Sequence, residues 1–106
     1  RLWDLAYAAY RFTPIAAPTN PDAFGTLDDQ CRRLRLFCDA YGLEDRSTVV
    51  DRLGERIAAM ADHLRAGAAA GDARCIANVA AGHVDIYVND RAHVERHRAQ
   101  LEAALR

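Results

Sequence analysis

The sequence predicts an all-α protein, a single helical domain over residues 1–106 folded as a bundle of four to five helices. Apolar residues recur at spacings of three and four in each long segment, and no stretch alternates with period two for long enough to form a strand. With 51% hydrophobic residues, 27% charged residues and a net charge of -1, the composition is that of a globular domain with one core.

The first expected helix starts directly after Arg1 and has two apolar stripes. They comprise Leu2, Leu5, Ala9 and Phe12 on one side, and Trp3, Tyr7 and Tyr10 on another. A helix that is apolar around most of its circumference is normally enclosed by a larger structure. Because few further helices are available to enclose it, we expect the chain to be a piece of a longer protein.

Proline and capping residues bound the second helix. The prolines predict a loop over residues 14–25, because proline lacks the amide hydrogen that a helix needs. Thr26 and Asp29 resemble a capping box, so we expect the helix to begin there and to end at Gly42. Its buried stripe is expected to be Leu27, Cys31, Leu34, Cys38 and Tyr41.

The third expected helix follows Ser47, which is a suitable N-cap residue. Its apolar stripe has the spacing of a single buried face and comprises Val50, Leu53, Ile57, Met60 and Leu64. Gly67 and Gly71 mark its end. The cysteines show no CxxC spacing, so we expect reduced thiols, with Cys31 and Cys38 on a buried face.

The last segment is expected to begin at Asp72 as the N-cap and to continue to Leu105. Its apolar positions include Ile76, Val79, His83, Ile86, Val94 and Leu101. The pattern leaves open whether this is one long helix or two helices that meet near Asn89 and Asp90. We favour a bend at that point.

Residues 83–89 resemble the HxDxxxxN loop of kinase-like phosphotransferases, in which the aspartate accepts the substrate hydroxyl proton and the asparagine helps to hold magnesium. Here the asparagine comes one residue early, and the stretch lies in a helical pattern although the chemistry needs an irregular loop. We therefore expect a structural role, with His83 and Ile86 facing inward and Asp85 facing outward.

A second candidate site consists of Asp90, His93 and His97, which share one face of a helix at the spacing of a His-His-carboxylate metal set. Exposed histidines at this spacing are more often incidental, and no other ligand is clearly brought close. We therefore expect no physiological metal. A small metal-binding protein built on these residues stays an alternative that only saturable metal affinity would support.

Several classes of function are excluded by composition. All 14 basic residues are arginine, so neither a phosphate-loop lysine nor the phosphate-binding lysine of kinases is present. The basic cluster of Arg32, Arg33 and Arg35 is flanked by aspartates and lacks interleaved aromatic residues, so we expect no nucleic-acid partner.

No apolar run suits a membrane span, and no targeting sequence is visible, so we expect a cytoplasmic protein. The arginine- and alanine-rich composition indicates a bacterial source.

Asp4 is an acid among apolar neighbours, where a buried charge is costly unless it is hydrogen-bonded. It either has a dedicated partner or stabilises the positive end of its own helix. The residues alone leave both readings open.

Residues 2–12, LWDLAYAAYRF, resemble the W-D-L-A-Y segment of the aminoglycoside phosphotransferase and choline-kinase-like superfamily. The stretches 33–37, 39–43 and 97–105 extend the resemblance over nearly the whole chain, with less specific helical patterns. In that family the catalytic loop and the metal-binding aspartate precede the W-D-L-A-Y segment. The resemblance therefore implies the C-terminal helical part of a protein-kinase-like C-lobe, without the catalytic loop and without that aspartate.

The same resemblance implies what the parent protein does. It would transfer a phosphoryl group from ATP, with Mg²⁺, to a hydroxyl of a small-molecule acceptor, and Asp4 would support the missing catalytic loop by hydrogen bonding. The chain's partner is then the remainder of the parent, and the chain alone is inactive. The alternative is a stand-alone helical interaction or oligomerisation module without catalytic activity, and a homodimer through the exposed first helix is possible in either case.

Overall fold

The computed structural model describes all of residues 1–106 and contains six α-helices and no strand. The helices are α1 (Leu2–Phe12), α2 (Leu27–Ala40), α3 (Val49–Ala69), α4 (Ala73–Ala80), α5 (His83–Arg96) and α6 (Arg98–Ala104). The all-α prediction is confirmed, but the expected number of four to five helices is wrong. No helix has both the length and the apolar character needed to cross a membrane.

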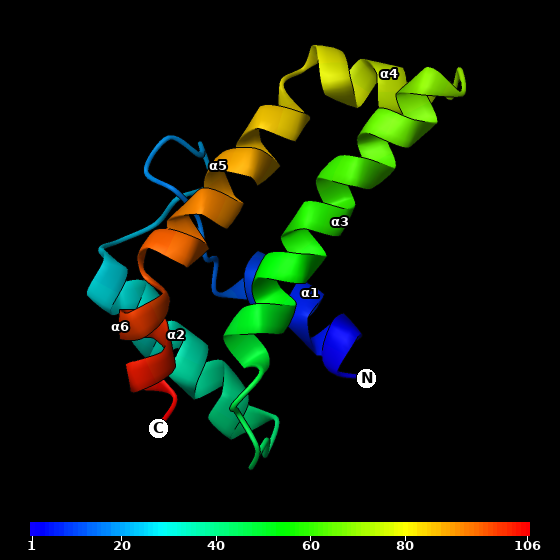
Figure 1. Cartoon of the computed structure of the whole chain (residues 1–106). Coiled ribbons are helices and arrows are strands. Elements are labelled where there is room, and N and C mark those ends of the chain that lie inside the picture. Colours follow the sequence, from blue (N-terminus) through cyan, green and yellow to red (C-terminus); the bar gives the residue numbers. More distant parts are fainter.

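The long helix α3 organises the molecule (Figure 1). At one end of α3 the short helix α4 reverses the chain, and α5 returns alongside α3. Helix α1 also packs against α3, whereas α2 and α6 pack against each other near the beginning of α3. The loop between α1 and α2 passes close to α5, which brings residues from the two halves of the sequence together.

The core confirms most of the expected apolar stripes. In α3 the predicted positions are buried except for Met60, which is partly buried, and in α2 Cys31, Leu34 and Cys38 are buried. All three cysteines are free and buried, as expected for Cys31 and Cys38. Tyr41 departs from its expected stripe: it is 51% exposed because it follows the last helical residue, where the chain turns away.

Capping explains where the helices begin. The Thr26 hydroxyl accepts a hydrogen bond from the amide of Asp29 at 3.2 Å, and the Asp29 carboxylate accepts one from the amide of Thr26 at 2.9 Å, which confirms the capping box. Asp72 caps α4 by accepting from the amide of Cys75 at 2.9 Å. The assignment of Ser47 is wrong, because its hydroxyl binds the Asp45 carboxylate and Thr48 takes the N-cap position of α3 without a side-chain hydrogen bond.

The segment after Asp72 forms three helices, so the expected bend near Asn89 and Asp90 is wrong. The chain breaks instead at Gly82, whose φ of 86° lies in the left-handed region that glycine adopts without strain, and again at His97. Asn89 and Asp90 lie inside α5. The end of α3 also differs from the prediction, in which Gly67 and Gly71 marked it. The helix continues through Gly67 and ends before Gly71.

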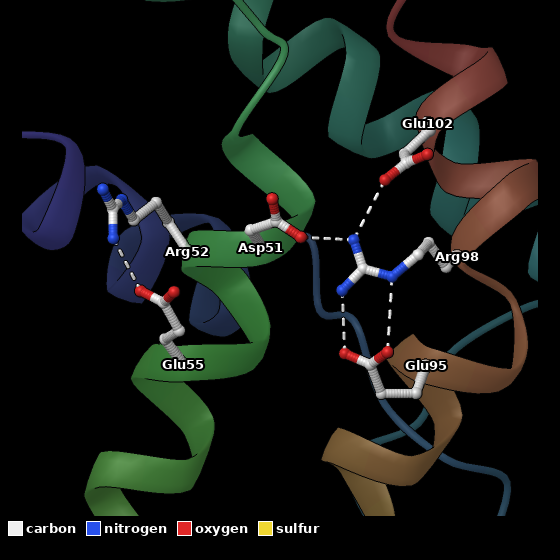
Figure 2. A network of polar contacts seen from close by, with 6 residues as sticks. All are labelled: Asp51, Arg52, Glu55, Glu95, Arg98 and Glu102. Carbon is white, nitrogen blue, oxygen red and sulfur yellow. Dashed lines mark hydrogen bonds and ion pairs between the residues drawn. The ribbon is translucent and has the colours of Figure 1, made fainter.

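Ion pairs of one arginine stabilise the chain turn at His97, between α5 and α6 (Figure 2). Arg98, the first residue of α6, forms ion pairs with Asp51 in the first turn of α3, with Glu95 of α5 at 2.9 Å and with Glu102 of α6 at 3.0 Å. One guanidinium thus links three helices where the chain turns at His97. The neighbouring pair of Arg52 and Glu55, at 2.7 Å, stays within α3.

Candidate functional site

The predicted site residue Asp4 lies on the surface, in the first turn of α1. Its carboxylate takes part in no hydrogen bond or ion pair within the chain. Trp3 and Tyr7, on the flank of the same helix, are 40% and 37% exposed. We call Asp4, Trp3 and Tyr7 the α1 surface; it is open to a partner, and the partner expected for Asp4 stays a prediction.

The other aromatic residues of α1 are divided between core and surface. Tyr10 is buried at 4% exposure, and Phe12 is 79% exposed at the C-terminal end of the helix. The two predicted stripes therefore both reach the core, through Leu5 and Ala9 on one and Tyr10 on the other, but neither is buried along its whole length.

The stretch resembling a catalytic loop, residues 83–89, lies within α5. His83 and Ile86 are half-buried and Asp85 is exposed, in agreement with the helical pattern. Asn89 is exposed as well. Regular helical backbone runs through all of these positions, so they do not form the irregular loop that phosphoryl transfer requires.

The three metal candidates are directed to different partners. Asp90 is fully buried among hydrogen-bond donors from α1 and from the loop that follows it. His93 is buried against Gln30 of α2. His97 lies near the surface and contacts Gln100 at 3.2 Å. The rings of His93 and His97 meet edge to face with centroids 4.8 Å apart. No group of three histidine, cysteine or acidic side chains in the structure is arranged to hold a metal ion.

Asp90 instead forms the centre of a buried polar network that the sequence did not predict. Its carboxylate accepts hydrogen bonds from the Tyr10 hydroxyl, from the Ala17 amide at 2.8 Å and from the Asn20 side-chain amide at 2.8 Å. A buried carboxylate is tolerated when several donors surround it. Burial and the bond to Asp90 raise the pKa of Tyr10 above its ordinary value.

Gln30 extends this network to α2. Its side-chain amide donates to the Ala16 carbonyl at 3.1 Å, and its oxygen accepts from the Ala16 amide at 3.4 Å. This orientation assigns the proton of the neighbouring His93 to Nε2, which donates to the Gln30 oxygen at 2.9 Å, and leaves the buried Nδ1 without a partner. Burial is the main cause that lowers the pKa of His93.

A sequence signal for this network does exist. Asp90 occupies the position between Ile86 and Val94 at i, i+4 spacing, so an acid interrupts the inward-facing stripe of α5. Gln30 likewise lies beside the buried face of α2, next to Cys31. A polar residue on an apolar stripe indicates a buried partner, but the stripe alone does not say which one.

No family model matches the chain, and no similar protein was found among curated proteins or solved structures. The geometry therefore has to carry any functional proposal. The structure offers a buried polar network that holds the 14–25 loop against α5, and an α1 surface with an exposed carboxylate and two partly exposed aromatic side chains.

Proposed function

We propose that the chain is the C-terminal helical part of an ATP-dependent, kinase-like small-molecule phosphotransferase. The rest of that protein would supply the catalytic loop, the metal-binding aspartate, and the sites for ATP and Mg²⁺. The acceptor would be a small molecule that carries a hydroxyl group. The observation that carries the proposal is the exposure of Asp4, which has no partner in this chain, within the LWDLAY motif.

The chemistry of the α1 surface supports this role. A carboxylate in the first turn of a helix can accept hydrogen bonds from backbone amides of a loop that lies across the helix. Trp3 and Tyr7 would add apolar contact beside it, since both are partly exposed. Asp4 would then be a positioning residue that fixes the catalytic loop without touching the substrate.

The test uses the complete gene product that contains this chain. ATP consumption is measured against a panel of aminoglycosides, sugars and small alcohols, and steady-state constants are then determined for Asp4→Asn. We expect kcat to fall by about 10- to 100-fold with little change in the KM for ATP, because residues that hold the groups of a site in place typically contribute this much. Asp28→Asn is the matched control, because Asp28 is also an exposed first-turn acid. Absence of ATP-dependent transfer to any acceptor, or equal kcat in both variants, would contradict the proposal.

The alternative of a stand-alone helical interaction or oligomerisation module has one observation in its favour. The chain encloses a core of 13 buried residues, including Tyr10 of α1. In that case Trp3 and Phe12 would mediate self-association, with a homodimer through α1. Light scattering after size exclusion distinguishes the two: a dimer that Trp3→Ser converts to a monomer favours the module, whereas a wild-type chain that stays monomeric at high concentration contradicts it.

A further inference from the structure

Arg56, in the middle of α3, differs from the other partly buried arginines. Four arginine side chains are half-buried: Arg33, Arg46, Arg56 and Arg98. The other three donate hydrogen bonds to carbonyl or carboxylate oxygens of the chain. Arg56 forms no hydrogen bond and no ion pair, and its Nε is buried without a partner. Its two terminal nitrogens, in contrast, reach the surface without a partner in the chain, where an external anion can accept hydrogen bonds from them.

Two aromatic rings hold the Arg56 guanidinium in place. Its central carbon lies 5.0 Å from the ring centroid of Trp3 and 4.9 Å from that of Tyr7. Neither ring is a conventional hydrogen-bond acceptor, so the terminal N–H groups can still donate to an oxygen of a ligand. A fixed guanidinium with free parallel N–H groups suits a carboxylate or a phosphate.

A surface pocket of about 410 Å³ opens beside this guanidinium, between α1, α3 and α5. Its lining combines polar and apolar side chains: Tyr7, Arg56, Ala59, Met60, His63, Leu64 and Tyr87. The pocket falls in the usual size range for small-molecule sites. Four other pockets, of 260 to 530 Å³, all include at least one aspartate or glutamate, whereas this one includes none. Its charge therefore favours an anion.

We propose that the Arg56 pocket binds a small organic anion. The carboxylate or phosphate of the ligand accepts hydrogen bonds from Arg56, with His63 as a second donor, and a flat apolar body lies against Met60 and Leu64. The site shares Trp3 and Tyr7 with the α1 surface but does not include Asp4, and the anion binding proposed here does not depend on the phosphotransferase role.

Trp3 is the single tryptophan of the chain and stacks on Arg56, so its fluorescence reports on the site directly. The probes are phenyl phosphate, benzoate, inorganic phosphate and the neutral benzyl alcohol. We expect a saturable change with phenyl phosphate or benzoate, and about tenfold weaker binding of both benzyl alcohol and inorganic phosphate. Raising the salt concentration should weaken binding of the anions only.

Variants assign the effect to Arg56. Arg56→Gln should weaken binding of phenyl phosphate about tenfold or more. Arg52→Gln, one turn earlier in α3, is the matched control because Arg52 is exposed and paired with Glu55; it should leave affinity unchanged. If circular dichroism shows that Arg56→Gln does not fold, the proposal is tested by comparing the binding of charged and neutral probes to the wild-type chain. Lack of saturable binding by either organic anion, equal binding of benzyl alcohol, equal binding of inorganic phosphate, or wild-type affinity in folded Arg56→Gln would each overturn the proposal.

Discussion

Tyr10 of α1 donates a hydrogen bond to Asp90 of α5 across 80 positions of the sequence, in the buried centre of the molecule. The same carboxylate holds the loop between α1 and α2 through Ala17 and Asn20. One acidic side chain therefore connects α1, the 14–25 loop and α5.

Asp90→Ala should be among the most destabilising single substitutions in this chain. It leaves three buried donors unpaired, and each unsatisfied group costs about 1–3 kcal/mol, so we expect the free energy of unfolding to fall by about 3 kcal/mol or more. Urea denaturation followed by circular dichroism measures the loss. Asn89→Ala, at the exposed neighbouring position, should change stability by less than about 0.5 kcal/mol. Equal stability of the two variants would show that the network contributes little.

Alkaline pH should destabilise the fold through Tyr10. Its folded pKa is raised above the ordinary value of 10.0, chiefly by burial and then by the hydrogen bond to Asp90. The folded state therefore keeps a proton that the unfolded chain releases, so this stability is complete below pH 10.0 and is lost as the pH rises above it. Circular dichroism followed as the pH rises above that value should report this loss. Tyr10→Phe should weaken this dependence, whereas Tyr41→Phe, at an exposed position, should preserve it.

Acidic pH should destabilise the fold through His93. Burial is the main cause that lowers its folded pKa below 6.5. The electrostatic effect of His97 acts in the same direction, and that of Asp90 acts in the opposite direction. The unfolded chain then binds the proton more readily, so this stability is complete above pH 6.5 and is lost as the pH falls through the folded pKa. Urea midpoints measured from neutral pH downward should show the loss. His93→Gln should flatten the curve, while His63→Gln, at an exposed position, should not; the same pH profile in His93→Gln and the wild type would assign the effect to other groups.

What could be predicted from the sequence was local. The 3.6-residue periodicity of α3 and the caps at Thr26 and Asp72 depend on residues within a few positions of each other, and all three were predicted correctly. Asp4 was singled out because a charge among apolar neighbours is costly to bury, but the structure places it on the surface, and its role stays a prediction.

The interior of the site could not be predicted in the same way. The helical pattern left open one helix or two helices meeting near Asn89 and Asp90, and the bend favoured there is wrong. In the structure the Asp90 carboxylate accepts hydrogen bonds from Ala17 and Asn20, which are 73 and 70 positions away in the sequence. The helix therefore continues through Asp90, and the chain breaks at Gly82 instead. Whether a polar residue ends a helix or enters the core depends on partners that local patterns do not contain.

At Gly67, α3 passes close to Cys75 of α4. A Cβ atom at position 67 would overlap the sulfur of Cys75 and lie 2.9 Å from its Cβ. Alanine favours helix over glycine by about 1 kcal/mol, but the overlap has to push the two helices apart, at a typical cost of about 1–3 kcal/mol. We therefore expect Gly67→Ala to lower stability by about 1 kcal/mol despite the gain in helix propensity.

Gly54 provides the matched control within the same helix. A Cβ there meets only the Glu95 carboxylate, at 3.3 Å, whose half-exposed side chain can shift slightly and keep its ion pair with Arg98, so Gly54→Ala should raise the thermal midpoint through helix propensity. Removing the sulfur in Gly67→Ala/Cys75→Ala should recover part of the stability lost in Gly67→Ala. If both glycine variants instead raise the midpoint equally, the contact between α3 and α4 is looser than the structure shows. A loss at Gly67 alone, relieved by Cys75→Ala, would establish that close packing of these two helices, rather than backbone freedom, requires glycine at position 67.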